Sequence, residues 1–191
     1  MTLFLDPHSD DLALFCAFTL QRHPDAQVCV VFDSYVQPAR GIPGCDAETR
    51  RTECTKAISL LKHRGDIRYL GFHDGEPIEA FAISEVLKEL YPDPERIWLP
   101  QYEHKGHQHH NTVAIAAGIA YGLGPSRSWY LTYTHSGGKS RGGTEVLPRS
   151  AEEIERKLLA LSCFKSQMQM DPRQGTAEWF YANDFREYII E

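Results

Sequence analysis

A chain of 191 residues is long enough to bury the core of one ordinary domain, and we expect a single domain over residues 1–191. Apolar residues make up 42% of the sequence and charged residues 24%, which excludes fibrous and intrinsically disordered classes. The 26 acidic residues outnumber the 20 basic ones, giving a formal net charge of −6. We therefore expect no nucleic-acid partner.

The sequence lacks the features of membrane and secreted proteins. No apolar run approaches the roughly 18 residues of a membrane span, so we expect none. The first residues lack the basic and apolar regions of a secretion signal, which favours a cytoplasmic protein. The five cysteines are odd in number and widely spaced, so neither a disulfide framework nor a CxxC zinc site is indicated.

Short apolar runs alternate along the chain with segments of helical periodicity. The runs predict buried strands at 3–5, 28–32, 67–70, 97–99 and 129–133. The periodic segments predict helices at 12–20, 52–62, 83–90, 112–121 and 150–161, the last beginning with a capping box at Ser150 and Glu153. This order of strands and helices predicts an α/β fold, a Rossmann-like layered sheet that is mostly parallel and has helices on both faces.

In such sheets ligands bind beyond the carboxyl ends of the strands. Polar residues follow three of the predicted strands, at 6–11, 73–75 and 101–110. The glycines of 137–143 lack the spacing of a phosphate loop, and we interpret them as a mobile surface loop. A nucleotide-binding Rossmann protein is disfavoured, because no glycine-rich fingerprint follows the first strand.

A histidine and two aspartates follow the first predicted strand. His8 and Asp11 stand three residues apart at the junction of strand and helix, where both side chains can reach one point. An imidazole and a carboxylate form part of a zinc shell, and Asp10, left outside that shell, is suited to act as a base beside the metal. In the alternative interpretation, Asp10 or Asp11 merely caps the helix that follows.

A histidine cluster follows the strand at 97–99: His104, His107, His109 and His110. The three-residue spacing of His107 and His110 suits neighbours on one helix face, with His110 as a third metal ligand and His107 directed at the substrate. A solvated histidine loop and adventitious metal binding are the alternatives. The presence of His8 and Asp11 at another strand end favours a site of two histidines and one aspartate with an open fourth position.

Two segments resemble the signature motifs of the PIG-L/LmbE-like zinc-dependent N-deacetylases. Residues 7–11, Pro-His-Ser-Asp-Asp, are similar to the PHPDDE motif, and residues 106–110, Gly-His-Gln-His-His, to the GHPDH motif. Weaker matches are the RxxE pair Arg50 and Glu53, the LGxxDG segment 70–75 and the late-helix segment 157–167. The order of these motifs along residues 2–167 makes the resemblance specific.

The sequence departs from the family's pattern at four positions: Ser9 stands for Pro, Leu12 for Glu, His109 for Asp and Phe164 for His. The expected ligands are all retained. Because the missing Glu is not a metal ligand in that family, its loss bears on hydrogen bonding or substrate orientation. A metal-binding or ligand-binding module that has lost turnover is therefore the alternative to an enzyme, and the retained Asp10 argues against it.

The resemblance implies a hydrolase that removes an N-acyl group, usually acetyl, from an amino sugar, a glycoconjugate or a similar amine. Zinc is the implied cofactor, although the ligand types also suit Fe²⁺, Co²⁺ and Mn²⁺. We expect Asp10 to accept the proton of the attacking water and His107 to donate a hydrogen bond to the oxyanion. Arg50, Asp74 and Lys105 are candidates for substrate binding, although each also suits an ordinary surface position. Homo-oligomers occur in the family, so the resemblance is compatible with one.

Overall fold

The computed structural model describes residues 1–33, 46–74, 79–132, 142–168 and 186–191. Its strands form one sheet and are β1 (Thr2–His8), β2 (Gln27–Phe32), β3 (Ile67–Phe72), β4 (Arg96–Pro100), β5 (Ser126–Tyr130), β6 (Thr144–Val146) and β7 (Glu187–Ile190). Their order across the sheet is β3-β2-β1-β4-β5-β7-β6. The first five of these strands pair in parallel, and β7 pairs antiparallel with β5 and β6. The prediction of a mostly parallel sheet is confirmed.

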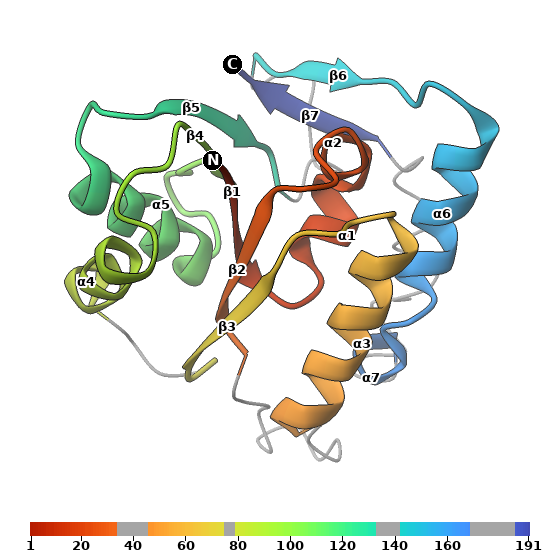
Figure 1. Cartoon of the computed structure of the whole chain (residues 1–191), viewed down its shortest axis with the longest axis horizontal. Coiled ribbons are helices and arrows are strands. Elements are labelled where there is room, and N and C mark those ends of the chain that lie inside the picture. Colours follow the sequence, from red (N-terminus) through yellow and green to blue (C-terminus); the bar gives the residue numbers. More distant parts are fainter. Residues whose placement is uncertain (34–45, 75–78, 133–141, 169–185) are drawn as a thin grey trace.

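Helices cover both faces of this sheet. Within the described residues they are α1 (Asp11–Phe15), α2 (Ala17–Gln21), α3 (Ala47–Leu60), α4 (Ala80–Leu90), α5 (Gln108–Tyr121), α6 (Ala151–Leu161) and α7 (Lys165–Met168). Figure 1 shows α4 and α5 on one side of the sheet and α1, α3 and α6 on the other. Each side has its own apolar core, so the layered architecture predicted from the sequence is confirmed.

The central strand β1 supplies side chains to both cores. Phe4 lies in the core on the side of α1, α3 and α6, where its ring stacks on Trp98 of β4 at 5.7 Å between centroids. Leu3 and Leu5 lie in the core formed with α4 and α5. A strand that is buried on both faces needs apolar residues at successive positions, which explains the run that predicted it.

Several predicted boundaries were wrong. The helix expected over 12–20 is two short helices, because the chain breaks at Cys16, where φ is −144°. The strand expected at 129–133 begins earlier, at Ser126, since its pairing with β4 runs through three polar or charged residues that apolar patterning overlooks. Residue 133 lies outside the described residues, as does most of the glycine segment 137–143.

Three helices begin three or more residues before their predicted starts, among them α4, which begins at Ala80 rather than at residue 83. α3 begins at Ala47, after Asp46 caps it by accepting a hydrogen bond of 2.7 Å from the N–H of Thr49. α5 begins at Gln108, four residues before the predicted start, so that the last two histidines of the cluster are helical. The first turn of α5 therefore carries His109 and His110, in agreement with the helical spacing inferred for the cluster.

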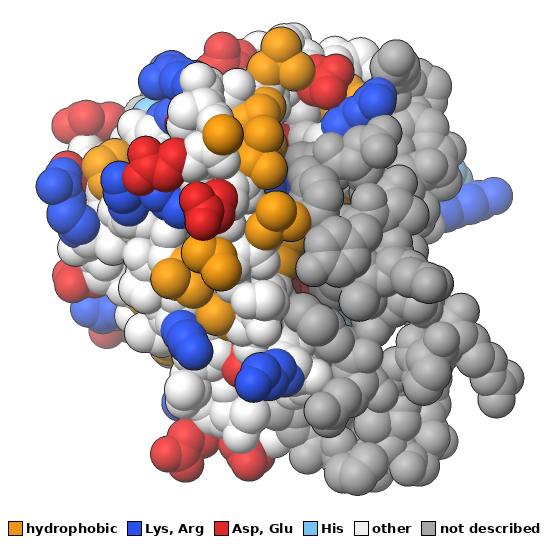
Figure 2. Space-filling view, turned by 90° about the vertical axis from the view of Figure 1, so that its right-hand side faces the viewer, with side chains coloured by type: hydrophobic (Ala, Val, Ile, Leu, Met, Phe, Trp, Pro, Cys, Tyr) orange, Lys and Arg blue, Asp and Glu red, His pale blue; other side chains and the backbone are white. Residues whose placement is uncertain are grey.

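The predicted N-cap of α6 is confirmed, because the Ser150 hydroxyl accepts a hydrogen bond of 3.2 Å from the N–H of Glu153. The residues that α6 buries are not all those that the spacing of its apolar residues would place inward. Ile154 is 37% exposed, whereas Lys157 is buried. Leu147 and Leu159 are also exposed on this side, and Figure 2 shows apolar side chains gathered along it.

Lys157 is buried because it pairs with Glu187 of β7 at 2.7 Å. The Glu187 carboxylate also accepts two hydrogen bonds of 3.0 Å from the N–H of Phe18 at the start of α2. Burial raises the pKa of Glu187, while Lys157 lowers it. The pair thus links α6, β7 and α2 through charges that have little access to water.

No helix among the described residues is long and apolar enough to cross a membrane.

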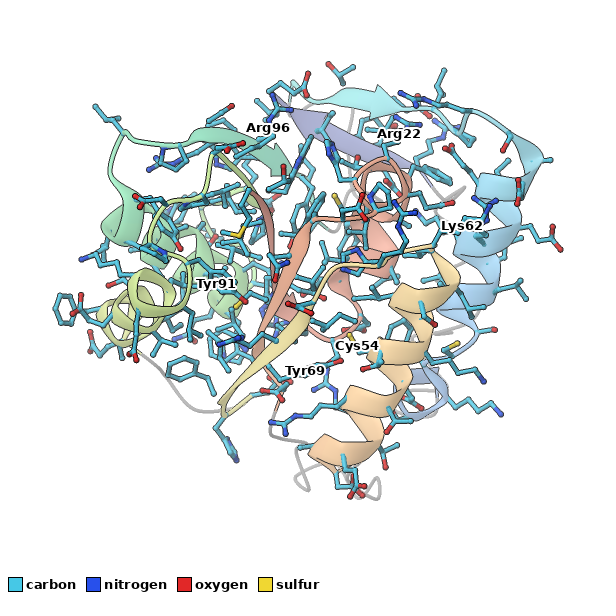
Figure 3. The ribbon with its side chains drawn as sticks, in the orientation of Figure 1. Arg22, Cys54, Lys62, Tyr69, Tyr91 and Arg96 are labelled. Atoms are coloured by element: carbon cyan, nitrogen blue, oxygen red, sulfur yellow. The ribbon has the colours of Figure 1, made fainter. Side chains whose placement is uncertain are left out.

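We predict that Lys157→Met lowers the free energy of unfolding by about 3–5 kcal/mol, because it leaves the Glu187 carboxylate buried without its cation. Urea denaturation measures this loss. Lys62→Met is the matched control, since Lys62, just after α3 (Figure 3), pairs with Glu152 of α6. Both side chains of this pair are more than 60% exposed. Such a pair contributes about 0–1 kcal/mol. Equal losses in the two variants would contradict the assignment of Lys157 to a structural ion pair.

Candidate metal centre and active site

Three donor side chains converge where β1 and β4 end. His8 is the last residue of β1, Asp11 opens α1, and His110 lies in the first turn of α5. Asp11 Oδ2 lies 3.0 Å from His8 Nδ1 and 3.0 Å from His110 Nε2, and the two ring nitrogens are 3.3 Å apart. All three residues are buried. The structure therefore brings together the three predicted metal ligands.

The topology of the sheet produces this convergence. β1 lies between β2 and β4. After β1 the chain forms β2 and β3 on one side of it, and then crosses over to form β4 on the other side. This reversal is the point where open α/β sheets form ligand-binding crevices. Because β1 and β4 are parallel neighbours, the residues after His8 and the start of α5 meet at one edge.

Hydrogen bonds orient two of the donors. The backbone N–H of His8 donates to Asp11 Oδ2 at 2.9 Å. His110 Nδ1 lies 3.0 Å from the hydroxyl of buried Thr132, which leaves Nε2 facing Asp11. Such contacts on the far side of a ligating ring fix its orientation and its tautomer.

The segment between β4 and α5 is fastened to the helix that it precedes. Asn111 Oδ1 accepts from the N–H of Glu103 at 2.8 Å, and Asn111 Nδ2 donates to the carbonyl of Glu103 at 2.8 Å. The tight turn brings Gly106 so close to Glu103 that an added Cβ would lie 2.7 Å from the Glu103 Cβ. His107, at the N-cap of α5, is thereby held beside the donors.

The two adjacent aspartates differ in their electrostatics. Burial alone would raise the pKa of Asp11, but the neighbouring His110 and His8 hold that pKa well below its ordinary value. Burial and the nearby Asp11 raise the pKa of Asp10, against the opposing effect of Arg50. Asp11 is therefore the permanent anion of the pair, and Asp10 is the carboxylate that accepts a proton more readily.

Asp10 is not a helix cap in the sense that the alternative interpretation required. It occupies the N-cap position of α1, but its side chain makes no capping hydrogen bond. Instead, Asp10 Oδ1 lies 3.8 Å from Arg50 Nη2, and Arg50 Nη1 donates to Asp74 Oδ2 at 2.9 Å. Arg50 is buried, so this cation lies between two carboxylates at the edge of the donor group.

The predicted substrate-binding residues fall into two groups. Arg50 and Asp74 lie at the site, joined by their ion pair. Lys105 lies in the turn before α5 with an exposed side chain and a positive φ of 64°, and it makes no hydrogen bond or ion pair with another described residue. The weaker sequence motifs also meet, because Glu53 accepts a hydrogen bond of 2.9 Å from the N–H of Ser166.

Sequence reasoning gave His109 no role, yet the structure places it in the site. It is buried, with Nδ1 3.0 Å from His8 Nε2. The histidine cluster marked this segment, but helical spacing coupled only His107 and His110. The side of α5 that carries His109 faces Phe32 of β2, a packing contact that spacing along one helix does not reveal.

The described residues contain two groups of donors close enough for a metal ion. One is His8, Asp11 and His110, and the other is His8, His107 and His109. The ring of His107 lies 5.0 Å from that of His8 and 4.8 Å from that of His110, between centroids. The first group is consistent with a divalent metal site, and its carboxylate supplies the negative charge that the all-histidine group lacks.

Comparisons with known proteins agree on the architecture. The family model described as PIG-L, GlcNAc-PI de-N-acetylase, matches residues 3–121. A search among curated proteins gives no match. Among solved structures, N,N'-diacetylchitobiose deacetylase from Pyrococcus horikoshii is similar at a TM-score of 0.68 and 19% identity, covering 99% of this chain and 82% of that one.

Two further solved structures share the fold. The zinc inhibited form of teicoplanin deacetylase Orf2 has a TM-score of 0.72 at 15% identity, covering 99% of this chain and 97% of that one. GalB, the 4-carboxy-2-hydroxymuconate hydratase from Pseudomonas putida KT2440, has a TM-score of 0.63 at 15% identity, covering 95% and 83%. Since the last is named a hydratase, likeness of fold alone does not decide the reaction.

We predict that His107 stays neutral down to mildly acidic pH in the metal-free protein. Desolvation, together with neighbouring His8 and His110, lowers its pKa from 6.5 to about 4. The folded state then binds fewer protons than the unfolded state between these values, so His107 contributes a loss of stability as the pH falls from 6.5 towards 4. Histidine ¹H–¹⁵N correlation spectra over pH 3.5–8 measure the pKa, and His107→Gln assigns the signal. A midpoint near 6.5 would contradict the prediction.

Proposed function

This chain belongs to the PIG-L family of N-deacetylases, and from that premise we propose that it hydrolyses the amide of an N-acetylated amino sugar or glycoconjugate with the help of one divalent metal ion, zinc in the simplest case. The observation that carries the proposal is the buried group of His8, Asp11 and His110. The alternative, a metal-binding or ligand-binding module without turnover, has no observation in its favour.

The donor set fits the metal that the family implies. A tetrahedral site with zinc–ligand bonds of about 2.0–2.1 Å separates its donors by about 3.3 Å. The three donor atoms here are separated by 3.0, 3.0 and 3.3 Å. Two neutral imidazoles and one carboxylate suit zinc, and they also suit Fe²⁺, Co²⁺ and Mn²⁺. When bound, such an ion activates water and polarises the amide carbonyl.

Asp10 is the residue that we assign to proton transfer. It lies beside Asp11 but outside the donor set, and its raised pKa favours accepting a proton from the attacking water. Arg50, 3.8 Å away, limits that rise and fixes the direction of the carboxylate. Once protonated, Asp10 is also the acid that returns the proton to the departing amine.

His107 complements this role as a hydrogen-bond donor. Because its pKa is lowered to about 4, its ring is neutral near pH 7. A neutral imidazole still carries one N–H, which can stabilise the negative charge that develops on the carbonyl oxygen. His107 therefore serves the transition state through a hydrogen bond, and the proton for the leaving group comes from Asp10.

The nature of the substrate is inferred from three considerations. The family description and the names of the similar deacetylases refer to GlcNAc-PI, to N,N'-diacetylchitobiose and to teicoplanin. Asp74, which is partly exposed beside the buried Arg50, presents a carboxylate at the site, a group of the kind that binds hydroxyl groups. Lys105 is exposed on the turn that leads to His107, which suits a contact with a more distant part of the substrate.

The departures from the family's motifs do not weaken this assignment. Leu12 and Phe164, which replace Glu and His, are both buried in the apolar core on the α1 side of the sheet. They are packing substitutions there, outside the donor set. The residues to which we assign the chemistry, Asp10, His107 and the three donors, are all present.

We predict that the purified protein binds one equivalent of zinc and that His8→Ala and His110→Ala each lose it on dialysis against a mild chelator. Each variant removes one of only three protein ligands. Elemental analysis gives the stoichiometry. His104→Ala is the control, because it removes an exposed histidine of the same cluster and should leave the equivalent in place. Full retention of metal by both His8→Ala and His110→Ala would refute the ligand assignment.

We predict that Asp10→Asn retains the metal and lowers turnover at least about a hundredfold, the lower range for loss of a general base. A screen of N-acetylated amino sugars with metal-reconstituted protein, monitored by release of free amine, provides the assay. Asp25→Asn is the matched control, because Asp25 lies on the surface in an ion pair with Arg64. Release of amine by Asp10→Asn at the wild-type rate would remove Asp10 from the mechanism, and parallel loss of metal would make it a ligand.

A further inference from the structure

His109 contacts the metal-facing histidine of β1 from the side opposite the donor group. The His8 ring presents Nδ1 to Asp11 and His110, and its other nitrogen, Nε2, lies 3.0 Å from His109 Nδ1. The His109 ring stacks on Phe32, with 4.1 Å between centroids and 15° between planes. This stacking sets the plane of His109, and with it the direction of Nδ1.

A neutral imidazole that ligates a metal through Nδ1 carries its proton on Nε2. That proton needs an acceptor, because His8 is buried. His109 Nδ1, at 3.0 Å, is nearer to His8 Nε2 than Asp74 Oδ1, at 3.7 Å. If His109 accepts at Nδ1, the proton of its own ring resides on Nε2.

Resting on the proposed function, we propose that His109 is a positioning residue, which accepts the Nε2–H of His8 and so holds Nδ1 towards the metal. It touches neither substrate nor metal in this role. Partners of this kind typically improve metal affinity about 10- to 100-fold, because they fix the ring and increase its basicity.

The charges around His109 explain why an imidazole suits this position, where the related motif carries Asp. Asp74 Oδ1 lies only 3.3 Å from His109 Nδ1, and the other oxygen of Asp74 accepts from Arg50. A carboxylate at position 109 would place a second negative charge beside Asp74 with one guanidinium to balance both. A neutral ring supplies the acceptor without adding a second full negative charge beside Asp74.

Two substitutions separate the hydrogen bond from the packing. His109→Phe keeps a ring against Phe32 but has no acceptor, whereas His109→Asn keeps an acceptor near the place of Nδ1 but loses the stacking. The measurement is the dissociation constant for Zn²⁺ by competition with a chromophoric chelator, supported by the visible spectrum of the Co²⁺ form. The melting temperature of the metal-free protein reports on folding.

We expect His109→Phe to bind Zn²⁺ about 10- to 100-fold more weakly, at a melting temperature close to wild type. We expect His109→Asn to bind within a few-fold of wild type although it melts lower. The reverse pattern, or unchanged affinity in both variants, would overturn the proposal. So would a wild-type stoichiometry of two that falls to one in both variants, since His109 would then be a ligand of a second ion.

The same titrations separate this proposal from the proposed function. If wild-type protein binds one Zn²⁺ and releases amine while both variants bind equally tightly, only the role of His109 fails. If wild-type protein binds no metal and His110→Ala changes nothing, the proposed function fails and the role of His109 fails with it.

Discussion

The burial of the Asp11 carboxylate is the constraint on which the site depends. Its side chain is 2% exposed, and an ionised carboxylate removed from water is strongly disfavoured unless it is paired and hydrogen-bonded. Its partners are the backbone N–H of His8 and the rings of His8 and His110. The end of β1 and the start of α5 must therefore lie together, which requires β4 beside β1. The order of the sheet and the composition of the site are thus linked.

The same burial gives two neighbouring carboxylates opposite pKa shifts. Asp11 is kept ionised by the two histidines, whereas burial and Asp11 itself raise the pKa of Asp10. Environments that drive the pKa values of adjacent groups apart are typical of sites that need a fixed charge and a mobile proton. Arg50 couples the pair to Asp74, so Asp10 and Asp74 share one cation.

The sequence predicted those parts of the molecule that local patterns determine. Apolar runs located β1, β2, β3 and β4, and polar residues at strand ends located His8, Asp11 and His110. Sequence patterns failed where contacts between distant segments of the chain determine the structure. β7 was not predicted, because its buried Glu187 is stabilised by Lys157, about thirty residues away, which no local pattern reveals. His109 was overlooked for the same reason, since its partners come from β1 and β2.

The match to the family covers residues 3–121, which carry all three donors, yet later residues complete the site. Thr132, after β5, faces His110 Nδ1 at 3.0 Å and so directs Nε2 towards Asp11. Ser166 donates to Glu53 on α3, the same helix that carries Arg50. Hydrogen bonds to the far side of donor residues fix the orientation of their side chains. The segment beyond residue 121 therefore belongs to the site in a physical sense, although the two motifs that carry the three donors end before it.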